Sequence, residues 1–209
     1  MAWIKCSGGS TDLPCSAEMK YNNTTSGTSI FTVDTTGLYL LAVGVTYSGV
    51  ASITLPQGVT AIYSKTVAPP QPRSMTAILV NLTIGDEVTM TATQGGWTGF
   101  FKVAFLLSGI TPIGEPTGEA SSDTEYIHNA PTNSYALTFG AALAKSSQYT
   151  EQYIGRQVVL STFEKYADGN CGANSVFRLS FDKGGMYRFY AFDGGMGAAI
   201  SFPISIDLL

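Results

Sequence analysis

The hydrophobic and polar positions of the chain fall into short segments separated by turn residues. In the first half, apolar and β-branched runs predict strands at residues 29–33, 38–47, 50–55, 59–67, 75–82, 87–93 and 100–107. Asp, Gly and Pro mark turns between them, at 34–37, 56–58, 85–86 and 94–96. Gly37, in the first of these turns, can adopt a positive φ. Short strands at roughly regular spacing are typical of a β-sandwich or barrel, not of alternating β-α units.

A second strand-rich region follows a segment of different composition. Residues 109–122 contain two prolines and three glycines and fit no strand pattern well, which predicts an interdomain linker. Beyond it, strands are predicted at 135–143, 157–163, 175–181, 186–192 and 198–206. Residues 149–156 suit a short helix or a strand equally. The pattern therefore predicts an all-β chain of two tandem antiparallel β-sandwich modules, 1–108 and 123–209.

The two regions share one short sequence echo. Residues 33–39 and 181–187 both read as a strand end, an Asp-led turn, a glycine and a strand whose second residue is Tyr. Common ancestry and shared hairpin physics both explain this match. Because the second copy of the echo lies only about 25 residues before the last residue, we expect no complete module of the same topology to fit after it.

Composition and charge limit the function classes. Hydrophobic residues make up 44% of the chain, charged residues only 12%, and the formal net charge is −4. Scattered Lys and Arg give no basic footprint for a nucleic acid, and no apolar run approaches the roughly 20 residues of a membrane span. The first residues lack the basic and apolar regions of a secretion signal, so we expect a protein that is either cytoplasmic at birth or exported by another route. A virion component assembled inside a cell fits this expectation.

The three cysteines, Cys6, Cys15 and Cys171, cannot form a complete disulfide framework. A bridge between Cys6 and Cys15 stays open, although synthesis in a reducing compartment disfavours it. No paired Cys-x-x-Cys spacing indicates zinc. We therefore expect a reductant and a chelator to change the melting temperature little.

Candidate chemistry is sparse. His128 is the only histidine, and no Gly-x-Ser-x-Gly elbow accompanies it, which favours an ordinary loop histidine over a catalytic one. Neighbouring acidic residues read as exposed, unlike the carboxylate pair of a glycosidase. The oxygen-rich turns at 168–170 and 193–195 lack the closing Glu of a calcium loop. We predict no catalytic residue, no metal and no cofactor, and hence no enzyme.

Aromatic residues are the candidates for binding. Trp97 lies in a glycine-rich loop and either plugs a module end or offers a flat apolar face to a sugar or a protein. In the strand at 186–192, alternation would place Tyr187 and Phe189 on one face and Tyr190 on the other. A partner subunit could cover one of these faces.

The first module resembles the globular head of the complement and tumour-necrosis-factor superfamily, over residues of about 11 to 108. The likeness rests on three segments, Phe31-Thr32-Val33 with Gly37-Leu38-Tyr39, then Ile84 to Val88, then Thr98-Gly99-Phe100-Phe101. The resemblance implies a jelly roll and, for most members, a compact trimer.

A further resemblance is of style, because the Met-x-Trp-Ile-Lys start and the Gly/Ser/Thr-rich turns resemble tail, fibre and capsid-accessory proteins of bacteriophages of gut bacteria. It implies a virion protein, either capsid decoration or a tail fibre component for host attachment, with other virion proteins and host surface glycans as partners. We expect a homo-oligomer, with a trimer favoured, whose exposed contact surfaces include residues 31–47 or 186–192. The alternative is a carbohydrate-binding module of a bacterial surface or secreted protein.

Overall fold

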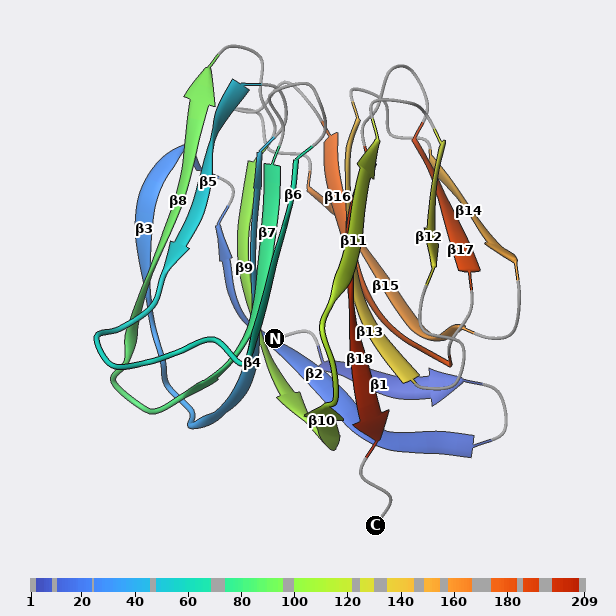
Figure 1. The fold of residues 1–209 in the computed structure, drawn as a ribbon, viewed down its shortest axis with the longest axis horizontal. Coiled ribbons are helices and arrows are strands. Elements are labelled where there is room, and N and C mark those ends of the chain that lie inside the picture. The colour runs from blue at the N-terminus through green and yellow to red at the C-terminus, as the bar shows by residue number, and fades with distance from the viewer. Residues whose placement is uncertain are drawn as a thin grey trace.

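A computed structural model shows an all-β protein of antiparallel sheets (Figure 1). The structure describes the backbone of residues 3–8, 11–23, 25–45, 48–68, 74–95, 100–121, 125–129, 135–144, 149–154, 158–166, 174–183, 186–191 and 197–206. It describes the side chains of residues 15–23, 25–45, 49–68, 74–93, 101–118, 135–139, 179 and 199–206. Within these residues there is no helix, so the predicted fold class is confirmed.

The strands of the first half follow the apolar runs closely. They are β1 (Trp3–Gly8), β2 (Thr11–Asn23), β3 (Gly27–Thr32), β4 (Gly37–Val45), β5 (Ser48–Thr54), β6 (Tyr63–Val67), β7 (Ser74–Leu82), β8 (Glu87–Gly95) and β9 (Phe100–Ser108). The sequence pattern did not predict β1 and β2. The turns at 56–58 and 84–86 are confirmed, each with a glycine at positive φ, Gly58 and Gly85. Gly37 does not use the positive φ that a glycine allows; a Cβ on it would lie 2.6 Å from Leu106 Cδ1, the end of a side chain that would have to move.

The second half contains as many strands as the first. They are β10 (Ile110–Pro112), β11 (Thr117–Ser121), β12 (Glu125–Asn129), β13 (Tyr135–Ala144), β14 (Tyr149–Ile154), β15 (Val158–Tyr166), β16 (Asn174–Lys183), β17 (Met186–Ala191) and β18 (Gly197–Ile206). The undecided segment at 149–156 is thus a strand over β14. The predicted linker holds β10 and β11, and both pair with β18, so this stretch is part of a sheet. The expectation that it contains no strand is wrong.

The two halves repeat one order of strand pairing. In the first half the chain is a nested hairpin, in which the pairs are β2–β9, β3–β8, β4–β7, β4–β9, β5–β8 and β6–β7. Each of these pairs recurs nine strands later, as β11–β18, β12–β17, β13–β16, β13–β18, β14–β17 and β15–β16. Each half is thus a nested hairpin whose strands are divided between two antiparallel sheets.

The repeat corrects two expectations from the sequence. The second half accommodates the same pairing order in full, although the echoed turn lies close to its end. In the repeat, the β16–β17 turn corresponds to the β7–β8 turn. The sequence echo had matched it to the β3–β4 turn, so that echo does not follow the structural equivalence.

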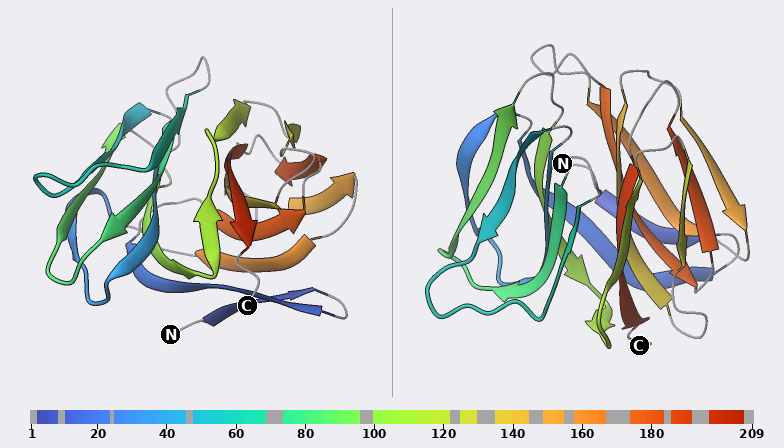
Figure 2. Two further views of the ribbon diagram at one scale, coloured as in Figure 1. Left: turned by 60° about the horizontal axis from the view of Figure 1, so that its bottom comes forward. Right: turned by 45° about the horizontal axis from the view of Figure 1, so that its top comes forward.

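Four sheets are stacked in layers (Figures 1 and 2). Sheet A has the order β1-β2-β9-β4-β7-β6 and sheet B the order β3-β8-β5. Sheet C has the order β10-β18-β13-β16-β15, with β11 also on β18, and sheet D the order β12-β17-β14. Sheets B, A, C and D follow one another across the molecule, so sheet A lies between the other sheet of its own half and the second half.

Sheet A is buried on both faces. One face packs on sheet B around Phe31, Tyr39, Leu41 and other apolar side chains. The opposite face forms a second continuous core with sheet C, in which Phe139 lies with its ring centroid 5.5 Å from that of Phe101 and 6.4 Å from that of Phe105. The two halves therefore share a hydrophobic core. Burial on both faces of sheet A also explains why β4 is apolar throughout.

This packing corrects one predicted contact surface. Residues 31–47 were expected to expose aromatic strand faces, but Phe31 is 4% exposed and Tyr39 is fully buried. Every described residue from Tyr39 to Val45 is buried as well. Sheets B and C cover this part of the chain from within the same molecule, so it is not free to bind a partner.

Candidate functional site

The aromatic residues singled out from the sequence fall outside the described side chains. Trp97 lies outside the described residues altogether. Tyr187, Phe189 and Tyr190 belong to β17, whose backbone is the central strand of sheet D, between β12 and β14. The strand is confirmed, while the role of these side chains in binding stays a prediction.

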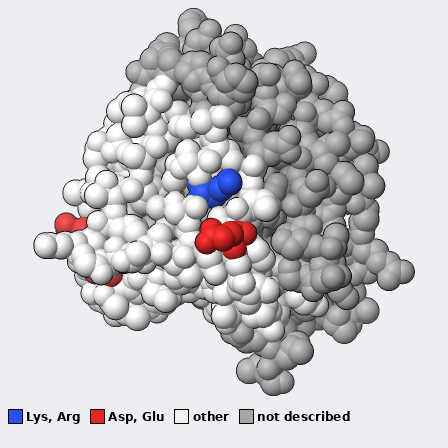
Figure 3. Space-filling view, in the orientation of Figure 1, with Lys and Arg blue, Asp and Glu red and all other residues white. Residues whose placement is uncertain are grey.

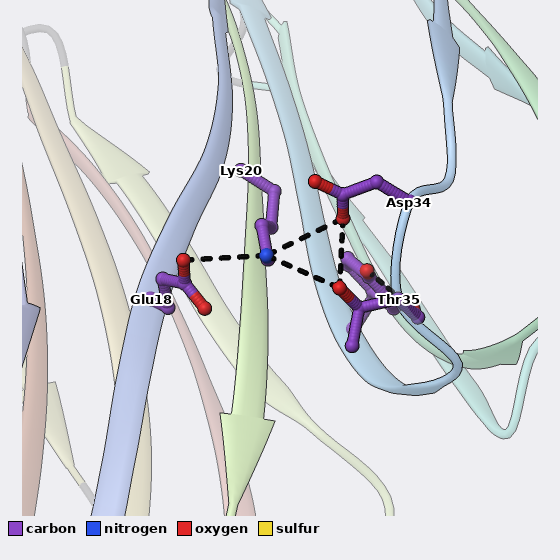
Figure 4. A network of polar contacts seen from close by, with 5 residues as sticks. Glu18, Lys20, Asp34 and Thr35 are labelled. Atoms are coloured by element: carbon purple, nitrogen blue, oxygen red, sulfur yellow. Dashed lines mark hydrogen bonds and ion pairs between the residues drawn. The ribbon is translucent and has the colours of Figure 1, made fainter. Parts of the chain in front are cut away.

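A polar network at the surface joins β2 to the turn between β3 and β4 (Figure 4). Lys20 lies at a register shift of β2, between Met19 and Tyr21. Its Nζ lies 3.2 Å from Glu18 Oε1 and 3.3 Å from Asp34 Oδ1, and it donates a hydrogen bond of 3.2 Å to Thr35 Oγ1. Lys20 is the extra residue at this register shift, and its amine lies between Glu18 of the same strand and the β3–β4 turn.

The charges of this network perturb its titratable groups. Burial alone would lower the pKa of Lys20, but its hydrogen bonds to Glu18 and Asp34 outweigh that effect and raise the pKa. The hydrogen bond from Thr35, followed by the contact with Lys20, lowers the pKa of Asp34. Burial, reinforced by the negative charges of Asp34 and Glu18, raises the pKa of Tyr39 to about 12.

The network acts as a tie within the fold. The Tyr39 hydroxyl donates a hydrogen bond of 2.7 Å to the carbonyl oxygen of Thr35, directly beneath the charged cluster. Lys20 thus links the carboxylates of Glu18 and Asp34 and the turn between β3 and β4. Each polar group of this network has a partner within it. This arrangement stabilises the β3–β4 corner.

A different polar cluster surrounds Asn23, the last residue of β2, and includes a buried lysine. Lys102 of β9 has no exposed surface, and its Nζ donates one hydrogen bond of 3.0 Å, to the carbonyl oxygen of Gly27. Burial lowers the pKa of this lysine. Asn23 of β2 pairs directly with Lys102 in the β2–β9 register. Sequence reasoning missed Lys102, although a single lysine between apolar residues of a strand is a visible signal.

Two further polar groups complete this cluster. Asn23 Oδ1 accepts hydrogen bonds from the backbone N–H of Thr25 at 2.8 Å and from Thr25 Oγ1 at 2.7 Å. Ser29 Oγ is buried and has no hydrogen-bond partner. Ser29 lies two residues after Gly27 on β3, the strand that holds the acceptor of Lys102. Buried polar groups are normally satisfied, so an amine with one acceptor and an unpaired hydroxyl are both unusual.

The outer face of sheet B is a flat surface of small β-branched residues. Thr28 lies beside Thr91, with their hydroxyl oxygens 3.0 Å apart, and Ile30 lies opposite Thr89. Ile30 is 56% exposed and Val50, on the third strand of the same face, is 58% exposed. Figure 3 shows the described part of another face of the molecule, where charged groups form only small, separate patches.

Cys15 is disulfide-bonded, so the chain contains a bridge of the kind that the sequence left open. The backbone register of β1 and β2 pairs Ile4 with Ala17 and Lys5 with Ser16, and the register shift follows directly after Lys5. This order points to position 6 as the next partner, opposite Cys15. The side chain of Cys6 itself lies outside the described residues.

Among the side chains that the structure describes, no group of three or more His, Cys, Asp and Glu residues could hold a metal ion. In the described part of the chain no helix is long and apolar enough to cross a membrane. The fold thus defines an all-β protein with repeated pairing order. No protein-family model matches the chain, and comparison with curated proteins and with solved structures finds no match.

Proposed function

We propose that the protein is a non-enzymatic structural component of a bacteriophage virion, either a capsid decoration protein or part of the tail or its fibres. The observation that carries the proposal is the repeated nested fold, whose two halves share the core between sheets A and C. A closely packed core on both sides of sheet A gives a stiff block. A rigid protein with a sheet face exposed at each end is better adapted to contacts between subunits than to catalysis.

The outer face of sheet B is the proposed contact surface, and its occupant is a second copy of the chain. Ile30 and Val50 are exposed on this face and are surrounded by threonines. Among the described residues of the face, the charged one is Glu87, which lies at its end. An uncharged, regular face of this kind can pack against itself in an isologous contact without burying a charge. The resemblance to the complement and tumour-necrosis-factor superfamily favours a trimer instead, in which this face would contact a different surface of the neighbouring copy.

The rival function is carbohydrate binding through Trp97 or through the β17 aromatics. Carbohydrate binding requires that the protein bind a sugar, whereas the first proposal requires that it bind a neighbouring subunit. A glycan array probed with the purified protein separates the two, with Trp97→Ala as the comparison. Sugar binding that is lost in this variant would favour the rival.

Electron microscopy of labelled particles tests the proposal directly. Particles purified from cells that make this protein would be exposed to a gold-labelled antibody against it. We expect label at a fixed position on each particle, and that position distinguishes capsid from tail. Label that stays with soluble or cell-surface material, and never with particles, would overturn the proposal.

A further inference from the structure

Lys102 lies in the core between sheets A and B without a counter-charge. It has no exposed surface, and both ion pairs among the described residues belong to Lys20. Lysines are almost never fully buried unless they are paired, because an unpaired buried charge costs several kcal/mol. A neutral amine avoids this cost, and a neutral amine is a nucleophile.

The register of β2 and β9 places an amide opposite this amine. Asn23 and Lys102 are direct partners, so their side chains leave the same face of sheet A with Cβ atoms about 4.5–5.5 Å apart. The four-carbon stem of the lysine is long enough to reach the amide carbon of Asn23 by a change of rotamer. In the structure the amine is unlinked and donates to the carbonyl of Gly27 instead.

The Asn23 carbonyl is prepared for attack. Its oxygen accepts two hydrogen bonds from Thr25, at 2.8 Å from the backbone nitrogen and 2.7 Å from the hydroxyl. Two donors on one carbonyl oxygen polarise it and stabilise the negative charge that develops on it when a nucleophile adds. The Asn23 side chain is half-buried and Thr25 is exposed, so the two donors on the carbonyl oxygen, and not the exclusion of water, carry this activation.

We propose that Lys102 and Asn23 form an intramolecular isopeptide bond. The lone pair of Lys102 Nζ attacks Asn23 Cγ, and a bond forms between them while the carbonyl oxygen is held by Thr25. A proton passes from Nζ to Nδ2, the Cγ–Nδ2 bond breaks, and ammonia leaves as the amide carbonyl re-forms. Nothing is oxidised or reduced. The bond joins β2 covalently to β9, the first and last strands of the nested hairpin, which removes the need to bury a charge.

Intact mass spectrometry of the full-length, reduced protein tests this bond. We expect a population whose mass is lower than the sequence mass by one ammonia, and tandem spectra in which the peptides that contain Asn23 and Lys102 are joined. The variants Lys102→Arg and Asn23→Ala should both show the full sequence mass. Thr25→Val should slow the loss of ammonia because it removes one donor.

Two controls separate this bond from other losses of ammonia. Asn22→Ala changes the neighbouring, exposed asparagine and should leave the mass loss intact. Asparagine can also lose ammonia by succinimide formation, but that loss would persist in Lys102→Arg. Wild-type protein that shows only the full sequence mass would overturn the proposal, and this measurement does not depend on whether any variant folds.

Discussion

Substituting Gly44 by Ala tests the packing of the two halves against each other. Gly44 faces Phe101 across the β4–β9 pair, on the face of sheet A that meets sheet C. A Cβ at this position would lie 2.4 Å from Cε1 and Cζ of the Phe101 ring, far inside van der Waals contact. The ring cannot simply move away, because it is 1% exposed and packs on Phe139 of the second half.

The cost follows from two opposing effects. Overpacking a closed core costs about 1–3 kcal/mol. Replacing Gly by Ala regains about 0.4–1 kcal/mol through the unfolded chain. The net loss in the free energy of unfolding lies between about 0 and 2.6 kcal/mol. The middle of both ranges gives about 1.3 kcal/mol, which for a chain of this size lowers the Tm by about 3–5 °C.

Thermal and urea unfolding followed by circular dichroism would measure this loss, with Gly114→Ala as the matched control. A Cβ on Gly114 would lie 3.4 Å from Pro203 Cγ, an ordinary contact, so this variant should be neutral or slightly stabilising. Adding Phe101→Leu to Gly44→Ala should recover part of the loss, because the smaller side chain makes room. A Gly44→Ala variant as stable as the Gly114→Ala control would refute the shared core.

Three further outcomes follow from the structure. Asp34→Asn should lower the free energy of unfolding near neutral pH, because the pKa of Asp34 is lowered from 3.8 in the folded state. The stability that Asp34 contributes is therefore present above pH 3.8 and is lost as the pH falls through the folded-state pKa. The urea midpoints of wild type and variant should differ less at pH 2 than at pH 7, and a difference that is unchanged at pH 2 would contradict the ion pair. Reduction should lower the Tm, since a bridge that closes a short loop at Cys15 contributes about 2–3 kcal/mol, and a non-reducing peptide map should show Cys6 as its partner; a Tm unchanged by reductant would count against this bridge. Limited proteolysis should spare 110–112 and 117–121, which pair with β18, so first cleavage within these strands would speak against the pairing.

Strand positions could be predicted where burial alone decides them. The run from Leu38 to Val45 is apolar throughout because both faces of β4 are buried, and its limits were close to correct. β2 could not be recognised, because Pro14, Glu18 and Lys20 interrupt its pattern. The register shift at Lys20 also interrupts the alternation of apolar and polar residues by which a strand is recognised in a sequence.

Pairing between distant strands was beyond the reach of local patterns. β10 and β11 pair with β18 through their backbones. This pairing does not need an alternating apolar pattern, and the Gly- and Pro-containing sequence of these two strands shows none. Gly118 illustrates this, because a Cβ there would lie 2.6 Å from Val67 Cγ1, in a contact between the two halves. The cluster around Lys102 depends in the same way on a register between strands that are far apart in sequence.

Sedimentation velocity of the purified protein over a wide concentration range tests most directly whether the protein acts by assembly through the outer face of sheet B. The informative variant is Ile30→Lys, which places a charge in the middle of that face. The control is Ile84→Lys, because Ile84 is more exposed, at 68%, but lies in the β7–β8 turn outside the face. We predict that wild type and Ile84→Lys sediment as the same oligomer and that Ile30→Lys sediments as a monomer. A wild-type protein that stays monomeric at every concentration, or an oligomer that Ile30→Lys leaves unchanged, would contradict the account.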